Sequence, residues 1–135
     1  MSLSNLSNRN EQTNTEQPLI LAVDDNDDNL QLLAQLLLLM EYSFITATDG
    51  FTAIDFARKY QPKLILLDMM LPDLSGLEVA SRLKQNTQTA AIPIIAVTAM
   101  ARVEDKESFI KAGCIDYITK PYVIDDLEVT IRRYV

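Results

Sequence analysis

The residues of this chain that could do chemistry stand directly after short apolar runs. They are Asp24, Asp25, Asp68, Thr98 and Lys120. Three carboxylates held close together repel one another strongly, and a hard divalent cation with oxygen ligands is the simplest relief. Mg²⁺ suits such a set best, because it accepts one or two carboxylates, keeps bound waters and leaves room for a phosphate.

The ammonium and the hydroxyl among these residues extend that chemistry. Lys120 would supply a mobile positive charge and Thr98 a hydrogen-bond donor, with Asp68 as the nucleophile. A nucleophile, a metal and charge stabilisation are what phosphoryl transfer onto a carboxylate needs. An Asp or Thr after a strand is more often a helix N-cap or a turn former, which is our interpretation of Asp27 and Asp28. The coincidence of five such residues argues against that alternative for the set.

Changes in periodicity predict the elements that position these side chains. Short apolar runs predict strands at 19–23, 43–47, 64–67, 94–97 and 115–118. Helical spacing predicts helices at 27–41, 51–60, 75–84, 102–112 and 124–134, with Gly113 as a C-cap. This alternation indicates an α/β protein with a doubly wound parallel sheet, and the flavodoxin-like (βα)5 strand order 2-1-3-4-5 is among the few topologies allowed. In that order strands 1 and 3 are neighbours, so the carboxylates at their ends meet in one shallow pocket.

Composition narrows the possible functions. The 135 residues are 48% apolar and 23% charged, which is the balance of one soluble domain. The lack of histidine excludes a Ser–His or Cys–His catalytic pair, and the single cysteine, Cys114, excludes an intramolecular disulfide and is interpreted as structural. The net charge of −7 argues against nucleic acid or an anionic membrane as a direct partner.

The chain divides into a polar tail and one domain. Residues 1–17 contain few large apolar side chains, so we expect a disordered polar tail there and the domain at 18–135. No apolar run approaches the ~20 residues of a membrane span, and residues 1–14 hold no apolar segment of a signal peptide. We therefore expect a cytoplasmic location.

Four segments resemble the receiver domain of two-component response regulators, the CheY-like superfamily. They are residues 21–26 (LAVDDN), 66–76 (LLDMMLPDLSG), 96–99 (AVTA) and 113–121 (GCIDYITKP). The resemblance spans about 18–135, and within the superfamily it is closest to stand-alone, DivK-like receivers and to the receivers of hybrid kinases. It implies a signalling protein that catalyses only its own phosphorylation and dephosphorylation.

By that resemblance, Asp68 is the phospho-acceptor, which takes a phosphoryl group from a histidine of a sensor kinase or of a histidine phosphotransfer protein. Asp25 would bind Mg²⁺ directly and Asp24 through a water, and Asp68 and the backbone carbonyl of Met70 would complete the protein ligands. A downstream protein partner is also implied, as is a monomer or a weak phosphorylation-dependent dimer.

The same resemblance gives roles to residues near the end of the chain. Thr98 would hydrogen-bond the phosphoryl group, and Lys120 would form an ion pair with it, aimed by a cis bond to Pro121. Tyr117 would be the switch residue, whose ring turns inward as Thr98 moves and reshapes the face made by helix 102–112, strand 115–118 and helix 124–134. The alternative for Tyr117 is a half-buried strand aromatic.

Two methionines are expected at the mouth of the pocket. Met70 stands two residues after Asp68, and Met100 two residues after Thr98. Apolar side chains there would cover an acyl phosphate without orienting water, so we predict slow autodephosphorylation. The alternative is that both methionines only fill gaps.

Helix 27–41 is unusually rich in leucine. One stripe suffices to cover a sheet, so Leu32, Leu36 or Leu39 would lie outside it and form an apolar surface for a helical phosphotransfer partner. Self-association and ordinary packing are the alternatives.

Other functional classes fit the residues less well. An aspartyl-phosphate phosphatase of the haloacid dehalogenase kind needs a second Asp two residues beyond its nucleophile. Two residues beyond Asp68 stands Met70, which cannot serve as that acid, although Asp25 and Asp27 have the required spacing. A flavodoxin would bind its flavin phosphate with hydroxyls and amides, whereas the loop after the first strand is acidic. A receiver-like scaffold that is never phosphorylated is disfavoured by the intact five-residue set.

Overall fold

Five short segments form the central sheet of the computed structural model, which describes residues 19–99 and 101–135. The strands are β1 (Leu19–Val23), β2 (Ser43–Ala47), β3 (Leu64–Asp68), β4 (Ile94–Thr98) and β5 (Asp116–Thr119). They pair in parallel in the order β2-β1-β3-β4-β5, which confirms the predicted flavodoxin-like topology. The predicted tail at 1–17 and Met100 lie outside the described residues.

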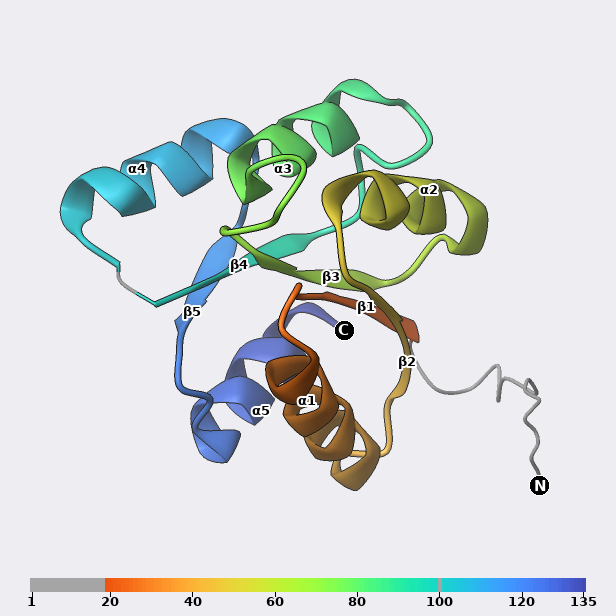
Figure 1. Cartoon of the computed structure of the whole chain (residues 1–135), viewed down its shortest axis with the longest axis vertical. Helices are drawn as coiled ribbons and strands as arrows, with labels where there is room; N and C mark the ends of the chain where they lie inside the picture. Colours follow the sequence, from red (N-terminus) through yellow and green to blue (C-terminus); the bar gives the residue numbers. More distant parts are fainter. Residues whose placement is uncertain (1–18, 100) are drawn as a thin grey trace.

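The helices of the described residues cover both faces of this sheet (Figure 1). They are α1 (Asp27–Leu39), α2 (Gly50–Tyr60), α3 (Gly76–Gln85), α4 (Val103–Ala112) and α5 (Ile124–Tyr134). Helices α2, α3 and α4 cover one face, and α1 and α5 cover the other. Because side chains alternate along a strand, Ile65 and Leu67 pack toward the first group while Leu64 and Leu66 pack toward the second. A strand covered on both faces must be apolar throughout, which explains the sequence of β3.

Three strands end one residue beyond their predicted ends, among them β5, which closes with Thr119. β3 closes with Asp68 and β4 with Thr98, so both residues belong to the sheet and do not follow it. Their backbone positions are therefore fixed by strand pairing, Asp68 opposite Val97 and Thr98 opposite Thr119. This register makes the carboxyl edge of the sheet a rigid platform.

The ends of α1 differ from the prediction. Its N-cap is Asn26, whose side chain accepts the Asn29 N–H at 2.9 Å, so the interpretation of Asp27 or Asp28 as the cap is wrong. Both aspartates stand in the first turn, where their charge favours the helix dipole. The helix ends two residues early because Glu41 adopts a left-handed φ of 64°.

Helix α1 presents leucines both to the core and to solvent. The buried stripe consists of Leu30, Leu33 and Leu37. Leu32 is 43% exposed and Leu39 72% exposed, as expected for residues outside that stripe, and Leu38 is exposed as well. Leu36 differs from this expectation because it is partly buried against the cluster under α1 and α5. None of the described helices is long and apolar enough to cross a membrane.

The junction of α4 and β5 agrees with the sequence interpretation. Gly113 ends α4 with a φ of 107°, as predicted for a glycine C-cap. Cys114 follows it and is buried, and burial raises the pKa of its thiol to about 11. A thiol that stays protonated at neutral pH is a poor nucleophile, so Cys114 packs as a small apolar residue.

Gly76 allows α3 to start close beside β3. A Cβ at this position would lie 2.6 Å from the Asp68 carbonyl oxygen and 2.6 Å from Met69 Cα. The Gly76 N–H donates to the Met69 carbonyl at 3.0 Å, so the approach is fixed by a hydrogen bond. The lack of a side chain at Gly76 therefore lets the backbone beside Asp68 keep its position.

Replacing Gly76 with alanine should lower the free energy of unfolding by about 2 kcal/mol or more, because backbone atoms cannot move aside as a side chain can. Urea denaturation measures this loss. Glu78→Ala in the same turn is the control: it removes only an exposed ion pair with Arg82, worth under about 1 kcal/mol. Equal stability of wild type and the Gly76 variant would contradict the close packing.

Candidate acidic pocket at the carboxyl edge of the sheet

Parallel pairing of β1 with β3 brings two carboxylates together. Val23 pairs with Leu67, so Asp24 and Asp68, each the next residue in the chain, lie side by side. The Asp24 N–H also donates to the carbonyl of the last residue of β2 at 3.1 Å. Asp24 is 1% and Asp68 4% exposed, whereas Asp25 is exposed at the rim. The three predicted carboxylates thus form one cluster, with ligand oxygens within 4.8 Å of one another.

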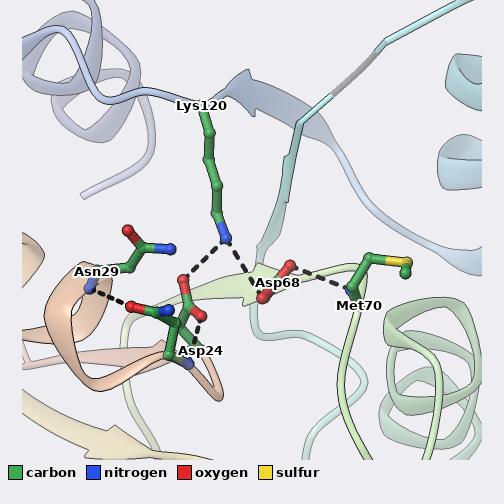
Figure 2. Close-up of polar contacts among 6 residues, drawn as sticks. Asp24, Asn29, Asp68, Met70 and Lys120 are labelled. Atoms are coloured by element: carbon green, nitrogen blue, oxygen red, sulfur yellow. Dashed lines mark hydrogen bonds and ion pairs between the residues drawn. The ribbon is translucent and has the colours of Figure 1, made fainter.

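Lys120 reaches this cluster from the loop after β5. Its Nζ lies 3.0 Å from Asp24 Oδ2 and 3.4 Å from Asp68 Oδ2, and Figure 2 shows the ammonium between the two carboxylates. The Lys120 N–H donates to the Thr98 carbonyl at 2.7 Å, which ties this loop to the end of β4. The peptide bond to Pro121 is cis, as expected.

Backbone amides hold the other oxygen of each buried carboxylate. Asp24 Oδ1 accepts the Asn26 N–H at 2.9 Å, and Asp68 Oδ1 accepts the Met70 N–H at 3.1 Å (Figure 2). Both bonds span two residues, which is the geometry of an Asx turn. The loops after β1 and β3 therefore orient the carboxylates that begin them.

The electrostatics of the pocket are those of excess negative charge. Burial raises the pKa of Asp68, and the neighbouring Asp24 adds to this, while the Met70 N–H and Lys120 oppose it. Burial alone would lower the pKa of Lys120, but the close contact of its ammonium with the carboxylates of Asp24 and Asp68 outweighs this effect and raises the pKa. Burial and the same two charges also raise the pKa of Tyr122, whose ring lies beside the pocket.

The donor set fits a hard divalent cation. Asp24 Oδ2 is buried and, among the described residues, makes no hydrogen bond of good geometry, although it lies near Lys120. A cation near Asp24, Asp25 and Asp68 would neutralise charge that one ammonium leaves uncompensated. Oxygen ligands alone, with one exposed carboxylate and room for water, are suited to Mg²⁺.

Two other predicted residues lie at the rim of the pocket. Thr98 is half-buried at the end of β4, and the register places it one strand away from Asp68. Met70 is 78% exposed, and its side chain extends away from the carboxylates in Figure 2. The position of Met70 at the pocket mouth therefore stays a prediction, and its partner in that prediction, Met100, lies outside the described residues.

Tyr117 lies on the side of β5 that faces α4. Its half-buried ring packs against the cluster under α2, α3 and α4, and Lys106 Nζ lies 4.9 Å from the ring centroid. Lys106 was not among the predicted residues, because nothing in its spacing from Tyr117 indicates that α4 brings the two together. Tyr122 was missed for the same reason: only the tertiary structure brings its ring beside the acidic cluster.

Asp68→Asn should stabilise the metal-free protein at neutral pH, raising Tm by a few degrees. The pKa of Asp68 is raised in the folded state, so its ionisation costs stability, and this cost grows as the pH rises through that pKa. The gain should therefore vanish in acid, where the wild-type carboxyl is protonated. Thermal unfolding at several pH values checks this, with Asp25→Asn at the exposed rim as the control. A lower Tm for Asp68→Asn than for wild type at neutral pH would contradict the raised pKa of Asp68.

Comparison with known proteins agrees with this geometry. The response regulator receiver domain family matches residues 20–132. The polar-differentiation response regulator DivK of Brucella anthropi is 40% identical over 115 residues, which make up 85% of this chain and 94% of that protein.

Solved structures share the fold over most of the chain. The receiver domain of the sensor histidine kinase PA1611 from Pseudomonas aeruginosa, with a magnesium ion coordinated in its active site cleft, has a TM-score of 0.81 and 30% identity, over 87% of this chain and 97% of that one. A co-crystal structure of the Saccharomyces cerevisiae histidine phosphotransfer signaling protein Ypd1 with the receiver domain of its downstream response regulator Ssk1 matches with a TM-score of 0.80 and 29% identity, over 87% and 88% of the two chains. The chain belongs to the response regulator receiver domain family of two-component signalling.

Proposed function

We propose that Asp68 accepts a phosphoryl group from a histidine of a sensor kinase or of a phosphotransfer protein. The observation that carries this proposal is the ammonium of Lys120 placed between two buried carboxylates, 3.0 Å from Asp24 and 3.4 Å from Asp68. Phosphoryl transfer needs a nucleophile and charge stabilisation held in place before the reaction, and this cluster supplies both.

The protein groups divide the tasks of the transfer, and Asp68 serves both as the nucleophile and as a metal ligand. An oxygen of Asp68 forms the new bond to phosphorus as the bond from phosphorus to the donor imidazole nitrogen breaks. Lys120 pairs with the oxygens of the arriving group, and the Thr98 hydroxyl donates a hydrogen bond to one of them. Asp24, Asp25, Asp68 and the Met70 carbonyl would hold Mg²⁺, which when bound offsets the charge of the carboxylates and the phosphate.

The exposed leucines of α1 are proposed as the docking surface for the phosphoryl donor. Helix α1 begins three residues after Asp24, so its first turns adjoin the pocket. Leu32 lies about 8 Å along the helix from its start and Leu39 about 18 Å, so both lie within reach of a helical partner that delivers its histidine to the pocket. The complex of Ypd1 with the receiver of Ssk1 supports a histidine phosphotransfer protein as this partner.

The output surface is proposed at α4, β5 and α5. Its exposed apolar side chains include Val103, Ile110, Ile115, Val123, Ile124 and Val129. A groove of about 420 Å³ lies between β5 and α5, and Tyr117 lines it. Movement of Thr98 toward a phosphoryl group would let the Tyr117 ring turn inward. The altered surface would then bind a downstream protein in the cytoplasm or a second copy of this chain.

Incubation with acetyl phosphate and Mg²⁺ should add about 80 Da, the mass of one phosphoryl group, to the intact protein. The adduct should require Mg²⁺ and should be absent from Asp68→Asn, because no other carboxylate of the cluster lies at the end of β3. Asp25→Asn should form it more slowly through weakened metal binding. A histidine-phosphorylated donor protein is the second phosphoryl source. An adduct that persists in Asp68→Asn, or no adduct from either donor, would contradict the proposal.

Met70→Asn together with Met100→Glu should shorten the lifetime of the phosphorylated protein several-fold, because polar side chains at the pocket mouth would orient the attacking water. The flexible Met70 side chain is exposed and unbranched, so it can lie over an acyl phosphate. The decay of the phosphorylated mass gives the rate. Met70→Leu, which keeps an apolar cover, is the matched control, and wild-type decay in the polar double variant would refute the shielding role.

A further inference from the structure

The loop between β3 and α3 is joined to the start of α2 by one side chain. Asp73 Oδ1 accepts the Gly50 N–H at 2.7 Å, and Asp73 Oδ2 accepts the Phe51 N–H at 2.9 Å. These partners are more than twenty residues away in the chain, so the contact is tertiary. Both oxygens of one carboxylate are therefore used to connect two elements that flank the acidic pocket.

Asp73 completes the N-terminus of α2. The first N–H groups of a helix have no partner within it. At α2, Asp49 supplies two acceptors: its side chain receives the Thr52 N–H at 2.7 Å, and its carbonyl receives the Ala53 N–H at 3.1 Å. Asp73 supplies the acceptors for the remaining two N–H groups. The hydrogen bonds from Gly50 and Phe51 also hold the pKa of Asp73 below its ordinary value, so it stays ionised at neutral pH.

The packing at this contact is close. A Cβ on Gly50 would lie 3.2 Å from Asp73 Oδ1 and 2.8 Å from Val79 Cγ2. Gly50 thus lets the loop and α3 approach the helix end together. Leu74 packs against the core beside the same contact and donates its N–H to Asp73 Oδ1 at 2.8 Å.

The same loop carries Met70. At one end the Met70 N–H binds the Asp68 carboxylate, and at the other the Gly76 N–H binds the Met69 carbonyl. Asp73 is the third attachment, in the middle of the loop. Its bonds to α2 therefore restrict how the peptide planes between Asp68 and Gly76 can rotate.

We propose that Asp73 is a positioning residue for the magnesium site, acting by fixing the direction of the Met70 carbonyl. This inference rests on the proposed function, in which that carbonyl is a metal ligand. A carbonyl in a loop attached only at its ends would have to be ordered when the ion binds, and that entropy would weaken the affinity. With Asp73 bound to α2, the ordering is already present in the metal-free protein.

Titration calorimetry with Mg²⁺ alone, without phosphoryl donor, tests the proposal. Asp73→Ala should raise the dissociation constant about tenfold, the size of effect typical of residues that orient metal ligands. Asp73→Asn retains one side-chain oxygen as acceptor and should give a smaller rise. Hydrogen exchange of the Gly50 and Phe51 amides should become faster in the alanine variant, which reports loss of the contact independently.

Asp49→Ala is the matched control. It removes a side-chain bond of the same length from the same end of α2 but none from the loop. It should lower Tm, as the loss of a helix cap does, and leave Mg²⁺ affinity unchanged. The proposal is overturned if Asp73→Ala binds Mg²⁺ as tightly as wild type does, or if Asp49→Ala weakens Mg²⁺ binding equally. If the alanine variant does not fold, Asp73→Asn takes its place in this comparison. A wild-type protein that binds no Mg²⁺ would instead remove the proposed function itself, and this would be evident before any variant is compared.

Discussion

The chemistry of this protein depends on two carboxylates that the sheet holds buried beside one ammonium. Asp24 and Asp68 lie in the protein interior because β1 and β3 are neighbours and end at the same level. Buried like charges are costly unless an opposite charge lies close to them. Lys120 meets part of that cost, and the excess negative charge that remains is the physical reason why the pocket should attract a cation.

The same ion pair connects the pocket to a distant surface. Lys120 directly follows β5, and its backbone N–H donates to the carbonyl of Thr98 on β4. Three residues before Lys120, Tyr117 contacts Lys106 of α4, and Asp116 beside it accepts hydrogen bonds from Tyr134 and Arg133 at the end of α5. A new charge on Asp68 would compete for the ammonium, and any shift would reach α4 and α5 through this one short strand.

The buried carboxylates and the exposed apolar side chains lie on different parts of the molecule. The carboxylates are held by strand pairing and Asx turns, and the close approach at Gly76 allows little movement behind them. The exposed leucines of α1 and the exposed apolar residues around β5 are the surfaces that we propose for partners. Chemistry that needs fixed oxygens and recognition that needs exposed apolar area are thus placed on different elements.

The sequence by itself determined the order of the helices and strands and the residues that could take part in phosphoryl transfer. Apolar runs of four or five residues separated by helical spacing allow few parallel topologies, and polar residues at the ends of such runs must gather at one edge. Local signals were less reliable at boundaries: Asn26 caps α1 although Asp27 and Asp28 are equally good capping types, because the cap is set by where the backbone turns. Only the tertiary structure decided that Lys120 lies between Asp24 and Asp68, that Lys106 contacts Tyr117, and that Asp73 completes the end of α2. These contacts join residues far apart in the chain, and no periodicity records them, since their geometry arises when the helices pack on the sheet.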